Sequence, residues 1–419
     1  MQLNEPSTPF KPGRRLAALG LALLLGACQA GGTGAMQPRS GAADRQPAGV
    51  AARSGADGPS GQAARVQVRG EPQQIALLLP LSGRAQQAGI AVRDGFLSAY
   101  YQASPGVRPR IRLYDVAARD VASAYLAAVT EGADAVVGPL TREEVAALAR
   151  VADGRATTLA LNFLAEGAVT PQRFYQFALS PEDEAREVAR RVIADGRPRG
   201  VALVPEGEWG QRVLAAFSAE LVAGGGALVD KHVYPTGTAD FEQILVDLLG
   251  QGGPGKADLA AARRVDAQFI FMPGQPVQGR LVRPQLKFQR IGDLPAYATS
   301  EVYEPSPAAN ADLNGVMFPE MPWMSGIDPG LASLREQIER LWPDRTSRRG
   351  RLYAMGVDAY RLIGDLHSLR NPLATPMAGM TGRLSVDKGR RIRRDLDWVQ
   401  VRSGQPRLLG APGAPAAGQ

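Results

Sequence analysis

The sequence of 419 residues contains only one cysteine and two histidines. These low counts argue against a disulfide-bonded fold and against a metal site built from cysteine and histidine. A single cysteine cannot form a disulfide within the chain, so no disulfide framework supports the fold. Neither His232 nor His367 has a cysteine or a carboxylate at the spacing of a metal-binding pair. A Gly-x-Ser-x-Gly nucleophile motif is missing as well. We therefore expect no metal site and no catalytic residues.

Two weak signals for chemistry have simpler explanations. The stretch Gly250–Lys256 follows the Walker A spacing up to its lysine, but Ala257 stands where a hydroxyl would be needed to bind magnesium. We interpret this stretch as a glycine-rich loop. Glu206 and Glu208 lie two positions apart after a predicted strand, and we interpret them as solvated carboxylates rather than as an acid–base pair. The sequence indicates a protein that is not an enzyme.

The apolar run Leu16–Leu25 is too short to cross a bilayer as a mature helix. Basic residues precede it, and Leu25–Cys28 follows the pattern of a bacterial lipobox. We predict a signal peptide over residues 1–27 and attachment of diacylglycerol and a fatty acyl chain to Cys28, with no other cofactor. An ordinary secretory signal with an incidental cysteine is the alternative. By resemblance to the sorting rules of enteric lipoproteins, Gln29 next to the cysteine implies the periplasmic side of the outer membrane.

Two segments have compositions that cannot bury a core. Residues 28–72 are rich in small residues, Pro, Gln and Arg, and we predict a disordered tether. Residues 410–419 predict a disordered tail. The formal net charge of +7 comes from arginines spread along the chain, with one local cluster at Arg390–Arg394. We interpret this cluster as a solvated hairpin face, with attraction to an acidic partner as the alternative. No nucleic-acid partner is expected.

Residues 73–409 alternate between strand and helix patterns. The run Ile75–Leu79 predicts a buried strand that opens through Ser82–Gly83 into a helix. Further strands are predicted at 111–115, 133–138, 157–162, 174–179, 201–204, 227–234, 269–272 and 296–299, with helices at 121–130, 209–221, 241–249, 280–289 and 352–366. Such alternation predicts parallel sheets in two lobes. Gly382–Val386 and Leu396–Val401 alternate at period two and predict an antiparallel C-terminal hairpin.

Several motifs, in order, resemble the LpoA/LppC lipoproteins, outer-membrane activators of class A penicillin-binding proteins. They are Ile75–Gly83, Ile90–Phe96, Val136–Pro139, Leu159–Asn162, Pro273–Arg280, Arg283–Phe288, Ala298–Tyr303 and Thr381–Leu384. The resemblance implies the α/β fold of type I periplasmic binding proteins, with two Rossmann-like lobes and three hinge crossings. Carried over, lobe one holds about 73–178 and 300–375, and lobe two holds about 179–299 and 376–409. Enteric members carry a helical-repeat domain where this chain has its predicted tether.

The resemblance also implies a function. It implies a non-catalytic, outer-membrane lipoprotein that binds and activates a class A penicillin-binding protein, a peptidoglycan glycosyltransferase/transpeptidase, and so regulates peptidoglycan synthesis. The fold alone leaves a second function open, since folds do not determine functions. That alternative is a lipid-anchored solute-binding protein for an amino acid or a similar small molecule, serving a transporter.

Two sets of candidate site residues follow. Loops after predicted strands give the cleft candidates Ser82, Gly83, Thr141, Asn162 and Ser300. Helix capping is the simpler explanation for Thr141, and turn formation for Ser82 and Asn162. The apolar segment Met317–Met324 predicts packing at a hinge, with an exposed partner patch as the sharper alternative. The patch residues would be Met317, Phe318, Met321 and Trp323.

Overall fold

The computed structural model describes residues 70–250, 264–306, 308–326, 330, 332, 335, 336, 340, 349–368, 373 and 375–410. The predicted signal peptide, Cys28 and most of the predicted tether lie outside the described residues. The same holds for the glycine-rich stretch after Gly250 and for the tail after Gly410. Those predictions remain expectations.

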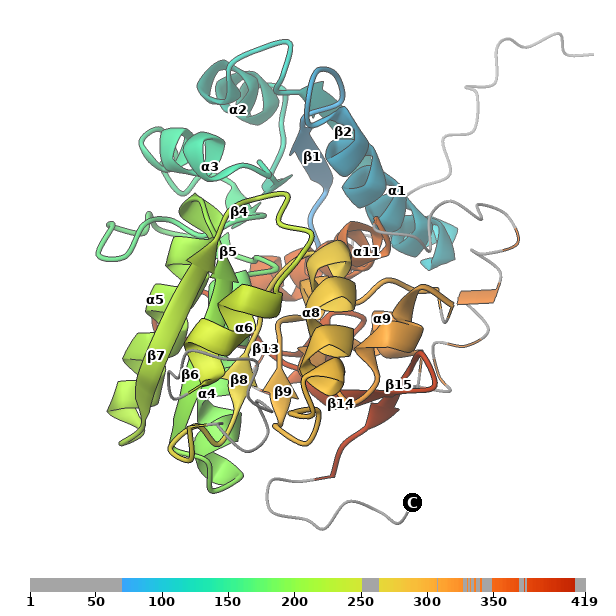
Figure 1. Ribbon diagram of the computed structural model, residues 1–419. Coiled ribbons are helices and arrows are strands. Elements are labelled where there is room, and N and C mark those ends of the chain that lie inside the picture. Colours follow the sequence, from blue (N-terminus) through green and yellow to red (C-terminus); the bar gives the residue numbers. More distant parts are fainter. Residues whose placement is uncertain are drawn as a thin grey trace, which may run out of the picture. The chain divides into compact units, whose positions relative to one another are not determined.

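The first sheet consists of five parallel strands in the order β2-β1-β3-β4-β5 (Figure 1). Its strands are β1 (Gln74–Leu79), β2 (Arg110–Asp115), β3 (Ala135–Val137), β4 (Thr157–Ala160) and β5 (Phe174–Gln176). Helices α1 (Gln86–Gln102), α2 (Val121–Thr130), α3 (Arg142–Ala149) and α11 (Gly350–Ser368) pack on it. Ile75 and Leu77 of β1 pack in one core cluster with α1 and α11, and Ala76 and Leu78 pack in another with α2 and α3. Cover on both faces explains why β1 is apolar throughout.

The second sheet has seven strands in the order β15-β14-β10-β9-β8-β6-β7. They are β6 (Arg199–Pro205), β7 (Ala227–Tyr234), β8 (Ile270–Phe271), β9 (Ala296–Tyr297), β10 (Met317–Glu320), β14 (Asp397–Arg402) and β15 (Gln405–Leu408). Strands β6 to β10 pair in parallel, and β14 and β15 add in antiparallel fashion. Helices α4 (Pro181–Ala194) and α5 (Glu208–Ala223) contribute to one core cluster of this sheet, and α6 (Glu242–Leu249) and α8 (Pro276–Phe288) to another. Short helical turns are η1 (Pro105–Val107), η2 (Ser300–Val302), η3 (Ala308–Leu313) and α9 (Pro322–Ser325).

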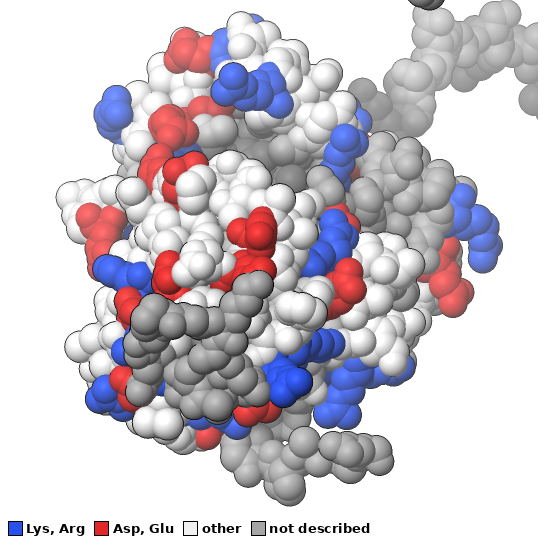
Figure 2. Space-filling view, viewed as in Figure 1, with Lys and Arg blue, Asp and Glu red and all other residues white. Residues whose placement is uncertain are grey.

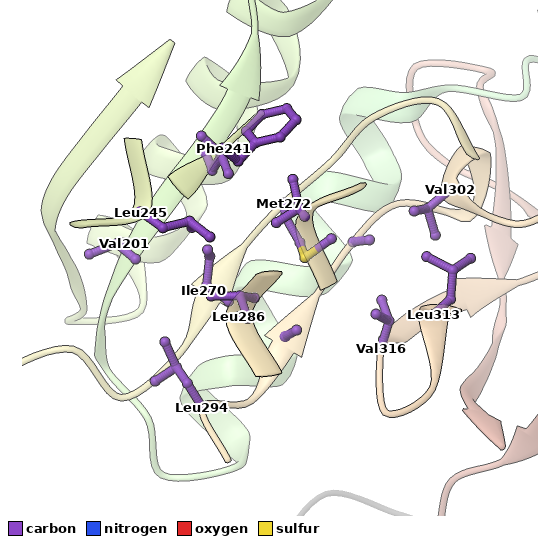
Figure 3. Close-up of a cluster of buried hydrophobic side chains, with 14 of the residues drawn as sticks. Val201, Phe241, Leu245, Ile270, Met272, Leu286, Leu294, Val302, Leu313 and Val316 are labelled. Atoms are coloured by element: carbon purple, nitrogen blue, oxygen red, sulfur yellow. The ribbon is translucent and has the colours of Figure 1, made fainter. Parts of the chain in front are cut away.

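The chain crosses between the two lobes three times, as the resemblance implies. The crossings are residues 177–180, the segment between β10 and α11, and Leu396. The predicted positions of the second and third crossings are corrected by the strand pairing. Strand β10 pairs with β9 and β14, so residues 300–320 lie with the second sheet rather than the first. Figure 3 shows the reason: Val302, Leu313 and Val316 belong to the buried cluster that holds Ile270 and Leu286.

A small third sheet carries the C-terminal hairpin. Its strands are β11 (Met377–Gly379), β12 (Gly382–Val386) and β13 (Ile392–Asp395). An antiparallel C-terminal hairpin is confirmed, but β12 pairs with β13 rather than with Leu396–Val401, which becomes β14 of the second sheet. Asp387 explains the early turn, because its carboxylate accepts the backbone N–H of Arg391 at 2.9 Å. Leu384 and Ile392 are buried in the core of the first lobe, so residues 377–395 belong there and not to lobe two.

Local sequence signals fix several helix starts. Thr141 and Glu144 form the reciprocal capping box expected from the sequence, with Oγ1 of Thr141 accepting the N–H of Glu144 at 3.3 Å. Ser180 caps α4, and Pro181 occupies its first turn. Within the described residues, no helix has both the length and the apolar character needed to span a membrane.

Candidate functional site: the cleft between the lobes

In the ion pairs between the lobes, the first lobe supplies the arginine and the second lobe supplies the acid. Arg142 on α3, Arg351 on α11 and Arg394 on β13 come from the first lobe, and each pairs with a glutamate of the second lobe. The shortest atom separations are 2.6 Å for Arg142–Glu182, 2.5 Å for Arg351–Glu320 and 3.5 Å for Arg394–Glu184. Two of these glutamates lie in the first turn of α4, where the helix dipole favours negative charge.

Glu182 accepts hydrogen bonds from an arginine of each lobe. Its side chain is 12% exposed, and one of its oxygens, Oε1, accepts hydrogen bonds from Arg142 at 2.6 Å and Arg212 at 2.8 Å. Its other oxygen accepts the hydroxyl of Ser180 at 3.1 Å. Burial alone would raise the pKa of Glu182, but the hydrogen bonds from Arg212 and Arg142 outweigh burial and lower the pKa to about 2. Glu182 is therefore ionised at any physiological pH.

Ser300 occupies the centre of a second, deeper network. Its backbone N–H and its hydroxyl both donate to the carboxylate of Glu184, at 2.9 and 3.1 Å. Its carbonyl oxygen accepts a hydrogen bond from Arg351 at 2.8 Å. Arg351 also donates to the wholly buried Glu320, whose pKa burial raises to about 7 in spite of the arginine. The serine thus joins a glutamate of the second lobe to an arginine of the first.

A cavity of about 350 Å³ adjoins this network. Its lining includes Ser300, Glu184, Arg351, Tyr303 and Glu301, together with apolar residues from both lobes. Burial raises the pKa of Glu301, and the charge of Glu184 raises it further. Gln275 donates to Glu301 at 3.1 Å. The cavity therefore offers an acidic and partly apolar wall.

The cleft candidates from the sequence have mostly structural partners. Ser82 hydrogen-bonds the carboxyl group of Asp115, and Thr141 caps α3. Asn162 donates to the carbonyl of Leu140 at 3.0 Å and accepts the N–H of Phe163 at 2.9 Å. Ser82, Asn162, Thr141 and Gly83 do not line the 350 Å³ cavity, whereas Ser300 does. The structure thus brings Ser300 alone of the five candidates to this wall.

The predicted partner patch is wrong as an exposed surface. Phe318, Met321 and Trp323 are 0, 2 and 2% exposed, and Met317 is half-buried. Trp323 lies against Tyr353 of α11 with ring centroids 5.8 Å apart. The packing alternative, at the crossing between β10 and α11, describes these residues correctly. An apolar segment at a crossing must be covered by both lobes, and that removes it from the surface.

The arginine cluster at 390–394 is exposed only in part: the Arg393 side chain is 47% exposed, whereas that of Arg394 is 5% exposed. Arg390 donates to the carbonyl of Pro171, and Arg391 donates to the carbonyl of Leu164 at 3.0 Å. Arg393 lies 3.6 Å from Asp183, and Arg394 pairs with Glu184. The interpretation as a solvated hairpin face fits Arg393, but it is wrong for Arg394, and Arg390 and Arg391 are half-buried. The cluster attaches the third sheet to both lobes.

Sequence reasoning missed the glutamates and arginines that define the cleft. Glu182 and Glu184 were visible only as acidic residues in a helix start, where the helix dipole explains them without a partner. Arg142 and Arg351 carry no local signal, because their partners lie 40 and 31 positions away along the chain. Glu206 and Glu208 are not a pair: Glu206 accepts the N–H of Thr236, and Glu208 binds Arg212.

Most charged side chains around the cleft have a partner of opposite sign. Arg142 and Arg212 pair with Glu182, Arg280 with Glu304, Arg351 with Glu320, and Arg394 with Glu184. On the face in Figure 2, acidic and basic side chains are likewise interspersed. No group of three or more potential metal ligands occurs among the described residues. A charged ligand would have to displace ion pairs that the protein already makes.

Two lobes, three crossings and a cleft at the carboxyl ends of the strands define a periplasmic binding-protein-like molecule. A model of the family described as "LppC putative lipoprotein" matches residues 66–404. The chain belongs to this lipoprotein family.

Similar proteins agree with this assignment. The penicillin-binding protein activator LpoA of Photobacterium profundum is 28% identical over 340 residues, covering 78% of this chain and 55% of that relative. The solved LpoA (YraM) C-domain from Haemophilus influenzae, described as a regulator of PBP1A, is 25% identical with a TM-score of 0.63, covering 80% of this chain and 100% of that one. An ABC transporter substrate-binding protein from Sphaerobacter thermophilus shares the fold alone, at 16% identity and a TM-score of 0.62, covering 81% of this chain and 97% of that one. The chain spans about half the length of the curated relatives that it matches.

Proposed function

We propose that the protein binds a class A penicillin-binding protein and raises its activity in peptidoglycan synthesis, without catalysing a reaction itself. Relatives named as penicillin-binding protein activators support this function. The solved domain described as a regulator of PBP1A corresponds over its whole length to the two-lobed body of this chain. The relatives are named as activators rather than as catalysts, which fits a protein that is not an enzyme.

The observation on this chain that supports the proposal is the state of the cleft. Ser300, the one sequence candidate that lines the cavity, has its hydroxyl hydrogen-bonded to Glu184, and Thr141 and Asn162, which lie outside the cavity lining, are hydrogen-bonded within the protein as well. A solute-binding protein needs a few convergent polar groups left for its ligand. An activator needs none, because it acts by docking. Docking raises the activity of a synthase only if the protein contacts the active conformation more favourably than the inactive one.

We further propose that Cys28 carries the lipid that holds the protein on the periplasmic side of the outer membrane. Family membership and the lipobox pattern support this location. Cys28→Ala should move the protein from the membrane fraction to the soluble fraction, whereas the unaltered protein should pellet with outer membranes. A Cys28→Ala protein that still pellets, with its signal peptide removed, would favour an ordinary secretory signal and another means of attachment.

The activator function is tested by capture of its partner. The full-length protein, immobilised through a C-terminal tag, is incubated with detergent-solubilised envelope that has been labelled with fluorescent penicillin. We expect one captured labelled band, which an excess of untagged protein competes away, and a faster glycan-polymerising rate when the identified synthase is mixed with the protein. Absence of a competed band, or capture with no change in synthase rate, would contradict activation.

One observation favours the second candidate, a solute-binding protein. The 350 Å³ cavity beside Ser300 has a size suited to a small molecule, and the Sphaerobacter protein shares the fold. A thermal-shift screen against amino acids tests it. A rise in melting temperature that saturates with one amino acid, and that Ser300→Ala removes, would favour this candidate over activation.

A further inference from the structure

We propose that ion pairs from first-lobe arginines to second-lobe glutamates clamp the lobes together, so that the cleft stays closed with no small molecule in it. The proposal concerns the body itself and does not depend on the partner that the body binds.

The clamp has three members of different depth. Arg142 and Glu182 form the outermost pair, because the Arg142 side chain is 43% exposed. Arg394 and Glu184 are nearly buried, with side chains 5 and 7% exposed. Arg351 and the wholly buried Glu320 are the innermost pair. Exposed pairs contribute little and are screened by salt, whereas buried pairs are costly to break because each partner is left uncompensated.

The glutamates are held ready for the first lobe by groups of their own lobe. Arg212 of α5 donates to the same oxygen of Glu182 that Arg142 binds, and Ser180 donates to the other oxygen. Ser300 supplies two hydrogen bonds to Glu184. Since these carboxylates are already oriented, the first-lobe arginines gain strong, charge-assisted hydrogen bonds without a large loss of side-chain entropy.

A bound ligand closes a two-lobed protein by contacting both lobes at once, which favours the closed state over the open one. Glu182 and Glu184 are part of the chain, so their contacts with both lobes do not depend on the concentration of a ligand. Arg142, Arg351 and Arg394 are each paired already, so a ligand carboxylate would have to displace a glutamate to bind any of them. A body clamped in this way presents one fixed surface.

The distance between the lobes in solution tests the clamp. Two thiols are introduced by Leu126→Cys on α2 and Val222→Cys on α5, both exposed positions on helices of different lobes. The full-length chain also carries Cys28→Ser, so that only the new thiols take the nitroxide label. Double electron–electron resonance then gives the distribution of distances. With no added ligand we expect one narrow distribution.

Arg394→Gln and Glu184→Gln, which break the nearly buried pair, should each add a second population at longer distance, rising above about 10% of molecules. Arg142→Gln, which breaks the exposed pair, should add a smaller one. Arg190→Gln is the control, because Arg190 pairs with Glu187 and Glu220 of its own lobe and its side chain is 54% exposed, close to the 43% of Arg142. Its distribution should equal that of the unaltered protein. The melting temperature of each variant establishes that it is folded.

Two outcomes would overturn the proposal. One is a broad or two-membered distribution in the unaltered protein, which would mean that the lobes already separate without a ligand. The other is an Arg394→Gln or Glu184→Gln distribution that superposes on that of the Arg190→Gln control. Neither outcome bears on whether a penicillin-binding protein is captured, so failure of the clamp is distinct from failure of the proposed function.

Discussion

Arg351 donates a hydrogen bond of 2.5 Å to Glu320, a carboxylate with no exposure to solvent. The pair joins α11 of the first lobe to β10 of the second. Buried ion pairs of this kind offset the cost of removing two charges from water only in part. The raised pKa of Glu320, about 7, reflects that remaining cost.

Glu320 should make the stability of the protein depend on pH between 4.5 and 7. Its folded pKa lies above the ordinary value of 4.5, so its contribution to stability is full below pH 4.5 and is lost as the pH rises through 7. The shift corresponds to a change of about 3 kcal/mol in the free energy of unfolding. Glu320→Gln should flatten this part of the profile of unfolding free energy against pH. Glu208→Gln, at an exposed position, is the control, and an unchanged slope in Glu320→Gln would contradict the assignment.

Asp358 should be among the polar side chains that matter most for stability. It is wholly buried on α11 and accepts the N–H groups of Met380 and Thr381, at 2.9 and 2.7 Å, and the hydroxyl of Thr381 at 2.6 Å. Asp358→Ala leaves these donors buried without an acceptor and should lower the unfolding free energy by about 3 kcal/mol or more. Thr381→Val removes one of the three bonds and should cost about 1 kcal/mol. Urea unfolding measures both; equal losses would show that the backbone donors find other partners.

The contact between α1 and α11 depends on two glycines. A Cβ on Gly95 would lie 2.0 Å from the carbonyl oxygen of Tyr353, and one on Gly356 would lie 2.1 Å from that of Val92. Gly95→Ala or Gly356→Ala must push the helices apart, and each should destabilise the protein by about 3 kcal/mol. Gly106→Ala is the control, because its Cβ would meet no atom within 4 Å. Melting curves that do not distinguish Gly356→Ala from this control would contradict the close packing.

Trp323 should affect stability rather than recognition. Its ring is 2% exposed and packs on Tyr353, so Trp323→Ala opens a cavity and should cost about 3–5 kcal/mol. Binding of a captured synthase, measured well below the melting temperature of the variant, should stay within about twofold of the unaltered protein. A selective loss of binding with unchanged stability would restore the partner-patch interpretation.

The sequence predicted the local features of the fold well. Strand β1, helix α2 and the Thr141–Glu144 capping box follow from patterns within a few residues, and the structure has each of them. Apolar alternation also identified β12 and β14 as strands. It could not identify their partners, because pairing depends on which sheet buries each strand: Val399 joins the core of the second lobe, and Leu384 joins that of the first.

The candidate site was harder to predict, for a physical reason. Ser300 was found because it ends a predicted strand, and a strand end is a local property. The glutamates of the clamp act by pairing with arginines of the other lobe. Such long-range pairs leave no periodic pattern in the sequence. The segment around Trp323 was predicted to pack at a hinge, and it does so, whereas the alternative of an exposed patch is wrong. The alternative stayed open because an apolar run does not show which residues will cover it.

The C-terminal segments of the chain complete both lobes, so neither lobe can fold before most of the chain has been synthesised. Residues 350–395 complete the first lobe, and β14 and β15 complete the second, so both lobes remain unfinished until nearly the whole chain is present. A protein exported from its amino terminus would therefore reach its destination with both halves still incomplete, each exposing an unpaired edge or an uncovered apolar face. No single cut yields two self-sufficient pieces, and the two lobes are expected to form and to be lost in one concerted event.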